Sequence, residues 1–203
     1  MWGMARMHLT GLQKILWAAA GVAALAYGAL MVFSDRAPVS VAEAAFRPTF
    51  SLPDAEGRLR TPADFAGKHL LVFFGFTNCP DVCPTTLAEV AQVMDDLGEE
   101  AENVQPLFIS VDPERDRRLG LAAFTAAFHP TILGLAGDTE QTRAAAESFK
   151  IFFERQDDAA APDGYMMSHS PALYLIGPDG DWLRQFTYGT PAADILADLQ
   201  PRL

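Results

Sequence analysis

The segment KHLLVFFGFTNCPDVCPTTL, residues 68–87, holds the features that decide the fold. Its first part, Lys68 to Phe76, is a mostly apolar run that predicts a strand buried on both faces. Thr86-Leu-Ala-Glu89 matches a capping box, and apolar residues at helical spacing predict a helix from Thr86 onward. A strand that leads into a helix through a loop with two cysteines predicts an α/β domain with a chemically active loop.

Strands and helices alternate along the rest of the chain. A hairpin is predicted around Asp54 to Gly57, and Ile151 to Ser168 is interpreted as an insertion. The other predicted strands are Val104–Val111, Ile132–Ala136, Ala172–Ile176 and Trp182–Tyr188, and the other predicted helices are Leu119–Phe128, Thr139–Phe149 and Ala192–Leu199. This order predicts a mixed sheet in a thioredoxin-like fold with an added N-terminal β-hairpin, although periodicity alone does not separate it from other small α/β folds.

Cys79 and Cys83 are the only cysteines of the chain, too few for a disulfide scaffold. A cysteine at a helix amino terminus meets the positive end of the helix dipole, which favours the thiolate. Thiolates attack disulfides and, as soft ligands, suit Cu(I), while a nearby imidazole extends the site to Cu(II). The alternative is a structural disulfide, which would stabilise only modestly across so short a loop.

Histidines supply the candidate third ligand. His69 and His129 are interpreted as structural residues, at a strand and at a helix end. His169 lies just before Ser170-Pro171 and the strand that begins at Ala172. In a thioredoxin-like domain the loop entering that strand lies beside the cysteine loop, so we interpret His169 as a ligand. We also hypothesise a cis Ser170–Pro171 bond, although most such bonds are trans.

Other polar and sulfur-containing residues are weaker candidates. Asp112 ends a predicted strand and is a candidate for a supporting role around the site. The alternative, slightly favoured, is helix capping by Asp112 or a solvated cluster at residues 114–116. Met166 and Met167 offer thioethers to Cu(I), but core packing is the preferred interpretation.

An apolar segment precedes the predicted domain. Ile15 to Phe33 is 19 residues long without a charge, enough to cross a bilayer core at about 1.5 Å per residue. Arg6 and Lys14 precede it, so the positive-inside rule predicts a cytoplasmic amino terminus and an exported domain. Ala42-Glu43-Ala44 resembles a signal-peptide cleavage site, but it lies far beyond the apolar run, which favours an uncleaved anchor.

The predicted organisation has four parts, and the charge is uneven among them. They are a cytoplasmic N-terminus at 1–14, a transmembrane anchor at 15–33, a linker at 34–46 and the thioredoxin-like domain at 47–203. Beyond residue 33 the chain has 13 basic residues (15 minus 2) and 26 acidic ones, a balance of −13. This argues against nucleic acid and against electrostatic docking on anionic lipid, and is compatible with a basic protein partner.

Three segments resemble the Sco/SenC family of copper-binding proteins. They are FFGFTNCPDVCPTTL (Phe73 to Leu87), VDPERD (Val111 to Asp116) and HSPALYLIGPDG (His169 to Gly180). They occur in the order and spacing of the family, and with the single anchor the resemblance covers nearly the whole chain. The Cys-Pro-Asp-Val-Cys-Pro segment followed by a distant histidine is far more specific than a cysteine pair alone.

The resemblance implies a thioredoxin fold behind one membrane anchor, with copper ligands at Cys79, Cys83 and His169. It implies a metallochaperone that assists assembly of the dinuclear copper centre of cytochrome c oxidase subunit II. A second periplasmic copper chaperone or a thiol reductase is an expected further partner. The domain is expected in the periplasm, on the outer side of the inner membrane, or in the mitochondrial intermembrane space of a eukaryote.

Three other functions compete with copper delivery. The first is a thiol-disulfide oxidoreductase, in which Cys79 and Cys83 form a catalytic redox pair that reduces the subunit II cysteines and His169 is a bystander. The second is redox signalling. The third is a peroxidase of the peroxiredoxin type, which needs a threonine three residues before the reactive cysteine. Phe76 and Pro80 occupy those positions, which argues against it.

Overall fold

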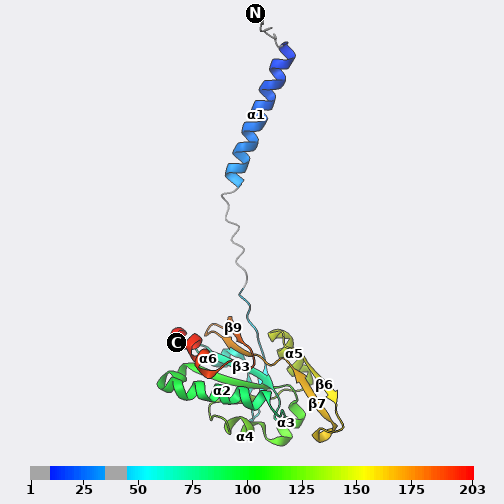
Figure 1. The fold of residues 1–203 in the computed structure, drawn as a ribbon, viewed down its shortest axis with the longest axis vertical. Helices are drawn as coiled ribbons and strands as arrows, with labels where there is room; N and C mark the ends of the chain where they lie inside the picture. Colours follow the sequence, from blue (N-terminus) through cyan, green and yellow to red (C-terminus); the bar gives the residue numbers. More distant parts are fainter. Residues whose placement is uncertain (1–9, 35–44) are drawn as a thin grey trace, which may run out of the picture. The chain divides into compact units, whose positions relative to one another are not determined.

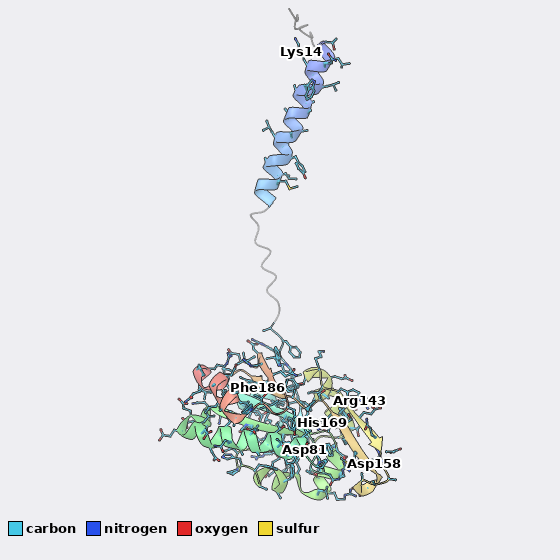
Figure 2. All side chains as sticks on the ribbon, viewed as in Figure 1. Lys14, Asp81, Arg143, Asp158, His169 and Phe186 are labelled. Carbon is cyan, nitrogen blue, oxygen red and sulfur yellow. The ribbon has the colours of Figure 1, made fainter. Side chains whose placement is uncertain are left out.

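The computed structural model describes residues 10–34 and 45–203, which belong to two separate units (Figure 1). The first contains the helix α1, Gly11–Ser34, and Figure 2 labels Lys14 near its amino end. Its stretch Gly11–Met31 is long and apolar enough to cross a membrane. This agrees with the apolar segment predicted at 15–33, whereas residues 1–9, most of the predicted linker and the Ala42–Ala44 motif lie outside the described residues.

A five-stranded sheet lies at the centre of the second unit. Its strands are β3 (His69–Gly75), β4 (Val104–Ser110), β5 (Leu133–Leu135), β8 (Leu173–Ile176) and β9 (Trp182–Phe186), in the order β5-β4-β3-β8-β9. Strands β3, β4 and β5 run parallel, whereas β8 and β9 are antiparallel to their neighbours. All seven residues of β3 are buried, which explains its continuous apolar sequence.

Helices cover both faces of this sheet. They are α2 (Val82–Leu97), α3 (Pro113–Leu119), α4 (Leu121–Ala126), α5 (Thr139–Phe149) and α6 (Ala192–Leu199). Neighbouring strand residues point to opposite faces, so Phe73 and Phe74 of β3 face different helices. Phe73 packs on Phe108, which contacts Phe124 of α4, while Phe74 packs on Phe149 of α5.

Two small hairpins complete the unit. Strands β1 (Leu52–Pro53) and β2 (Leu59–Arg60) form the predicted N-terminal hairpin. Strands β6 (Phe153–Asp157) and β7 (Tyr165–His169) form a second antiparallel hairpin, which occupies the predicted insertion and ends one residue beyond it (Figure 1). Its last residue is His169, so the predicted ligand ends a strand rather than lying in a loop.

The order of elements and the mixed sheet confirm the predicted thioredoxin-like fold with an added hairpin. The predicted start of α2 is wrong, because the helix begins at Val82 and not at Thr86. Pro84 lies in the first turn, where the missing N–H would have had no helical partner. The predicted capping box does not form, since the Thr86 hydroxyl donates to the Val82 carbonyl and Glu89 accepts from the Ala192 N–H.

Two further predictions need correction. The helix predicted at Leu119–Phe128 corresponds to α4, which is shorter, and α3 before it was not predicted. Gly120, with a φ of 85°, separates the two helices. The Ser170–Pro171 bond is trans, since no peptide bond among the described residues is cis. The trans form is the default for such bonds, and hydrogen bonds between Ser170 and Phe152 extend the hairpin directly up to the proline.

Candidate metal and thiol site

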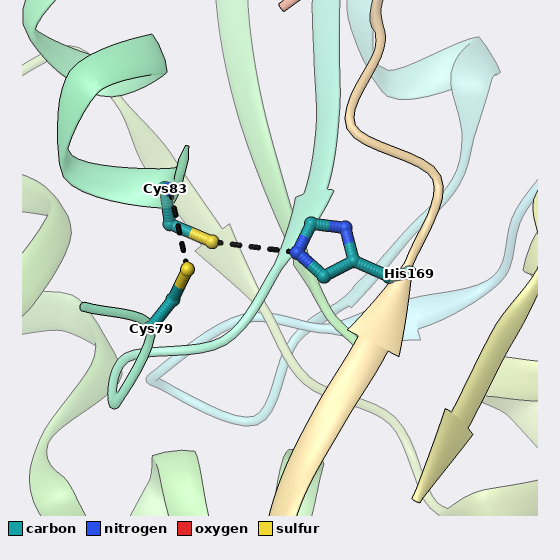
Figure 3. A group of neighbouring side chains, drawn as sticks. All are labelled: Cys79, Cys83 and His169. Atoms are coloured by element: carbon teal, nitrogen blue, oxygen red, sulfur yellow. Dashed lines mark hydrogen bonds between the residues drawn. The ribbon is translucent and has the colours of Figure 1, made fainter. Parts of the chain in front are cut away.

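Three side chains that are candidate metal ligands converge at one end of the sheet (Figure 3). The sulfurs of Cys79 and Cys83 and a ring nitrogen of His169 all lie within 4.8 Å of one another. Cys83 is in the first turn of α2, Cys79 is in the loop before it, and His169 ends β7. The fold therefore brings together the three residues that the sequence had singled out. Their role as ligands stays a prediction.

The Cys83 sulfur lies against the backbone of β3. Cys83 is completely buried, whereas Cys79 is partly exposed. A Cβ atom added at Gly75 would lie 2.7 Å from the Cys83 sulfur and 2.9 Å from the Phe108 ring. Glycine is therefore required at position 75 because the sulfur occupies the space of a side chain.

The two cysteines differ in acidity. The backbone N–H of Cys83 donates to the Cys79 sulfur at 3.4 Å. A hydrogen bond from the Cys83 thiol, helped by His169 and outweighing the effect of burial, lowers the pKa of Cys79 to about 4. The same hydrogen bond and burial raise the pKa of Cys83. Near neutral pH the reduced pair therefore consists of one thiolate, at Cys79, and one thiol, at Cys83.

A buried carboxylate holds the cysteine loop in place. Asp116 of α3 accepts hydrogen bonds from the backbone N–H and the hydroxyl of Thr77, at 3.0 and 2.8 Å. Its other oxygen accepts from the Ser110 hydroxyl at 2.6 Å. Burial raises the pKa of Asp116. These bonds tie the loop to the end of β4, two residues before Cys79.

The ring of His169 is oriented by its neighbours. Its Nδ1 lies 3.0 Å from the Ser170 carbonyl, and its Nε2 lies 3.6 Å from the Cys83 sulfur. A carbonyl oxygen only accepts, so Nδ1 carries a hydrogen and donates it there, which leaves Nε2 as the ring nitrogen that faces the sulfurs. The ring also meets Phe73 and Phe76 edge-on, with centroids 5.9 and 5.8 Å apart.

A shallow cavity of about 210 Å³ opens beside Cys79 and His169. Cys79 and His169 line it together with apolar side chains, among them Phe76, Met166 and Met167. Both methionines pack against the core, as preferred from the sequence.

The supporting role considered for Asp112 stays a prediction, and its carboxylate contacts Arg115 and Tyr165. It pairs with Arg115, whose Nε lies 2.7 Å from its carboxylate, and accepts a hydrogen bond from the Tyr165 hydroxyl at 3.0 Å. In the part of the chain that the structure describes, no hydrogen bond joins Asp112 to Cys79, Cys83 or His169.

The interpretation of residues 114–116 as a solvated cluster is wrong for two of the three. Glu114 is exposed, but Arg115 is 2% exposed and Asp116 is fully buried. The sequence placed this segment at the edge of the sheet where functional groups of α/β proteins collect, but no local pattern indicated that the side chains of Arg115 and Asp116 are buried.

The other two histidines of this unit have structural surroundings. His69 is buried in the first position of β3, and burial lowers its pKa. The Nδ1 of His129 lies 2.7 Å from the Thr131 hydroxyl. Neither belongs to a cluster of metal-ligating side chains among the described residues.

Comparison with known proteins gives a consistent family match. The SCO1/SenC family model matches residues 39–203. The mitochondrial SCO2 homolog of Bos taurus is 44% identical over 133 residues, which cover 64% of this chain and 50% of that protein. The chain spans about half the length of the mammalian SCO2 homologs that it matches.

Solved structures match more than three quarters of the chain. The structure of Bradyrhizobium japonicum ScoI with copper bound has a TM-score of 0.70 and 34% identity, and the match covers 78% of this chain and 100% of that one. BsSco, a member of the Sco family of cytochrome c oxidase assembly proteins in which a disulfide switch has been identified, has a TM-score of 0.58 and 26% identity, over 77% of this chain and 93% of that one.

Proposed function

The chain belongs to the SCO1/SenC family, and from that premise we propose that it is a copper metallochaperone. It binds copper through Cys79, Cys83 and His169 and assists assembly of the dinuclear copper centre of cytochrome c oxidase subunit II. The observation that carries the proposal is the convergence of two sulfurs and one imidazole nitrogen within 4.8 Å. The relatives support it, since ScoI has been solved with copper bound and BsSco belongs to a family of oxidase assembly proteins.

The chemistry of the donor set fits copper. Thiolates are soft ligands that favour Cu(I), and an imidazole is a good ligand for both copper oxidation states. Structural zinc normally takes four protein ligands, and the described residues contain one cluster of three. Three ligands in a low-coordinate site leave room for an incoming ligand from a second protein.

The setting of the site suits transfer of the metal. Cys79 and His169 line a cavity open to solvent, whereas Cys83 is buried. A target can therefore approach Cys79 and His169 first and displace the ligands one at a time. Oxidation of the cysteine pair to a disulfide removes both sulfur ligands, so redox state controls copper loading.

The proposed location is a membrane surface facing an exported compartment. Helix α1 acts as a single anchor, with residues 1–14 in the cytoplasm, 15–33 in the membrane and 34–46 as a linker. The domain at 47–203 then lies in the periplasm, or in the intermembrane space of a mitochondrion. Its partners there are subunit II and a second copper chaperone or a thiol reductase.

A second function is favoured by one observation. The low pKa of Cys79, about 4, beside a buried thiol is also the arrangement of a disulfide reductase. In that role Cys79 attacks a disulfide of subunit II and forms a mixed disulfide with it. Cys83 then attacks the Cys79 sulfur, so the two subunit II cysteines are released as thiols and Cys79 and Cys83 end as a disulfide. His169 is then dispensable.

Copper stoichiometry tests the first proposal. The reduced full-length chain in detergent micelles is titrated anaerobically with Cu(I) against a chromophoric competitor. We expect one tightly bound copper per chain, abolished in the Cys79→Ser/Cys83→Ser double variant and weakened strongly in His169→Ala. His129→Ala is the matched control and should bind as tightly as the wild type.

Transfer is tested by mixing the copper-loaded chain with the copper-free domain of subunit II and recording the absorption of its dinuclear centre. A chain that binds no copper contradicts the metallochaperone. Copper binding without transfer, together with reduction of a subunit II disulfide that persists in His169→Ala, supports the reductase instead.

A further inference from the structure

Arg115 is the largest side chain that the structure buries completely, with 2% of the residue exposed. A buried guanidinium loses its hydration, and an ion pair in the interior often does not repay that cost. Two of its three nitrogens, Nε and Nη2, have no geometrically good hydrogen bond, although Nε lies 2.7 Å from the Asp112 carboxylate. Stability alone is therefore a weak explanation for an arginine at this position.

The contacts of Arg115 connect the two segments that carry the metal ligands. On the hairpin side, its guanidinium carbon lies 4.2 Å from the centre of the Tyr165 ring, and Nη1 donates to the Tyr165 carbonyl at 3.3 Å. On the cysteine side, the same carbon lies 5.5 Å from the centre of the Phe76 ring. Phe76 precedes Cys79 by three residues, and Tyr165 begins the strand that His169 ends.

Both contacts lead to His169. Phe76 meets the His169 ring edge-on, with the ring planes at 89° and the centroids 5.8 Å apart. Tyr165 lies on the same side of β7 as His169, since residues four apart in a strand share a face. Asp112 closes the arrangement, because it pairs with Arg115 and accepts the Tyr165 hydroxyl. One cation thus holds the start of β7 and the aromatic ring against which His169 packs.

We propose that Arg115 is a positioning residue for the metal site, which holds β7 and Phe76 so that the His169 imidazole faces the two cysteine sulfurs. The metal-binding part of this inference rests on the proposed copper function. A planar guanidinium is needed because it contacts two rings while it pairs with a carboxylate. Lysine keeps the charge but presents no plane, so it replaces arginine only in part.

A matched control lies on the same helix. Arg118 also joins α3 to the hairpin, through an ion pair with Asp163 at 2.8 Å, but both side chains are largely exposed. Exposed ion pairs contribute little, and among the described residues neither partner forms a hydrogen bond, ion pair or ring contact with Tyr165 or Phe76. Arg118→Met therefore makes the same substitution on the same helix without disturbing the proposed support.

The first test needs no metal. Histidine-labelled, reduced full-length protein in micelles is compared by NMR with Arg115→Met, Arg115→Lys and Arg118→Met, and the His169 signals are assigned from His169→Ala. Two aromatic edges should shift the ring signals of His169 away from those of a free histidine. We expect Arg115→Met to move the His169 ring signals toward those of a free histidine and Arg115→Lys to move them partly in that direction. Arg118→Met should leave them unchanged.

The second test measures copper. We expect Arg115→Met to lower the affinity for Cu(I) about 10- to 100-fold, the range seen when partners of ligands are removed. In the His169→Ala background the same change should have an effect of less than about threefold, because its action passes through the histidine. Unchanged His169 signals in a folded Arg115→Met, or an equal loss of affinity with and without His169, overturns the inference.

Outcomes for the two proposals are separable. If the wild type binds no copper, the proposed function fails, whereas the NMR comparison still decides whether Arg115 positions His169. If Arg115→Met does not fold, as judged from its signal dispersion, Arg115→Lys and Tyr165→Leu take its place under the same readouts. Unchanged His169 signals in both folded variants then overturn the inference.

Discussion

The Nε2 atom of His169 lies 3.6 Å from the sulfur of Cys83, although 86 positions separate the two residues in the chain. They come from different elements, the first turn of α2 and the last residue of β7. The cysteine pair is a local feature of one loop, but the third candidate ligand is delivered by the insertion hairpin. Changes that loosen the hairpin should therefore move the His169 nitrogen away from the site and leave the sulfurs of Cys79 and Cys83 in place.

Thiol alkylation should distinguish the two cysteines. With a pKa of about 4, Cys79 should react with iodoacetamide at pH 6 at least about tenfold faster than the buried Cys83. Its rate should stay level from pH 8 down to about 5 and fall only near pH 4, since a thiolate disappears as pH drops through its pKa. Peptide mapping by mass spectrometry measures both rates.

The cause of this acidity can be tested in the same assay. Cys83→Ala removes the leading hydrogen bond to the Cys79 sulfur, so the pH profile of Cys79 should move upward. A wild-type profile that falls between pH 9 and 7, as for an ordinary thiol with a pKa of about 8.5, contradicts the prediction.

Gly75→Ala should damage the site more than the fold. The added Cβ would lie 2.7 Å from the Cys83 sulfur and must displace it or the strand. Overpacking of this kind costs about 1–3 kcal/mol of unfolding free energy. We expect a Cu(I) affinity lower by about tenfold or more, because a ligand is displaced. Urea unfolding and Cu(I) competition measure the two effects.

Gly134→Ala is the matched control for this change. Its Cβ would lie 2.8 Å from Leu121, in β5 and away from the cysteines. It should destabilise the protein by a similar amount and leave copper affinity unchanged. Equal losses of affinity in both variants would show that general destabilisation, and not sulfur placement, weakens binding.

Asp54 should make stability depend on pH. Burial favours its neutral form, but hydrogen bonds from the Arg60 side chain and the Arg58 N–H outweigh this and lower its pKa. The unfolded-state pKa is about 3.9, so the stabilisation is complete above that value and is lost as pH falls toward the lower folded-state pKa.

Asp54→Asn should lower the unfolding free energy by about 1–3 kcal/mol at pH 7, because charged hydrogen bonds are lost. The difference from wild type should shrink below about pH 4. Urea denaturation at pH 7, 5 and 3.5 measures it. Asp157→Asn, whose side chain is 91% exposed, is the control and should change stability little at any pH. A difference for Asp54→Asn that stays constant with pH contradicts the assignment.

The proposed membrane orientation can be read from the cysteines, which are the only two in the chain. A membrane-impermeant maleimide should label Cys79 in right-side-out vesicles and should require permeabilisation in inverted ones. The Cys79→Ser/Cys83→Ser variant gives the background. If Cys79 is labelled in inverted vesicles and not in right-side-out ones, the orientation is the opposite of the one proposed. Deletion of Gly11–Ser34 should release the protein into the soluble fraction.

Elements with strong local signals were predicted with correct bounds. Helix α5 runs from Thr139 to Phe149 as expected, and Asp138 and Gln141 form its capping box. Helix α6, Ala192–Leu199, also agrees. Helix α5 has a local cap, and the apolar residues of both helices follow helical spacing, which neighbouring residues encode. The start of α2 was misplaced because Thr86 and Glu89 offered a local cap, whereas in the folded chain Glu89 bonds the amino end of α6.

The sequence by itself determined the order of the five central strands and of four of the helices, the cysteine loop at the amino end of a helix, and the three candidate ligands. Residues four positions apart, such as Cys79 and Cys83, are kept close by the chain. Only the tertiary structure decided that His169 reaches the sulfurs from the end of β7, and that Arg115 is buried against the rings of Tyr165 and Phe76. Contacts between segments remote in the chain depend on packing, which no local pattern of residues encodes.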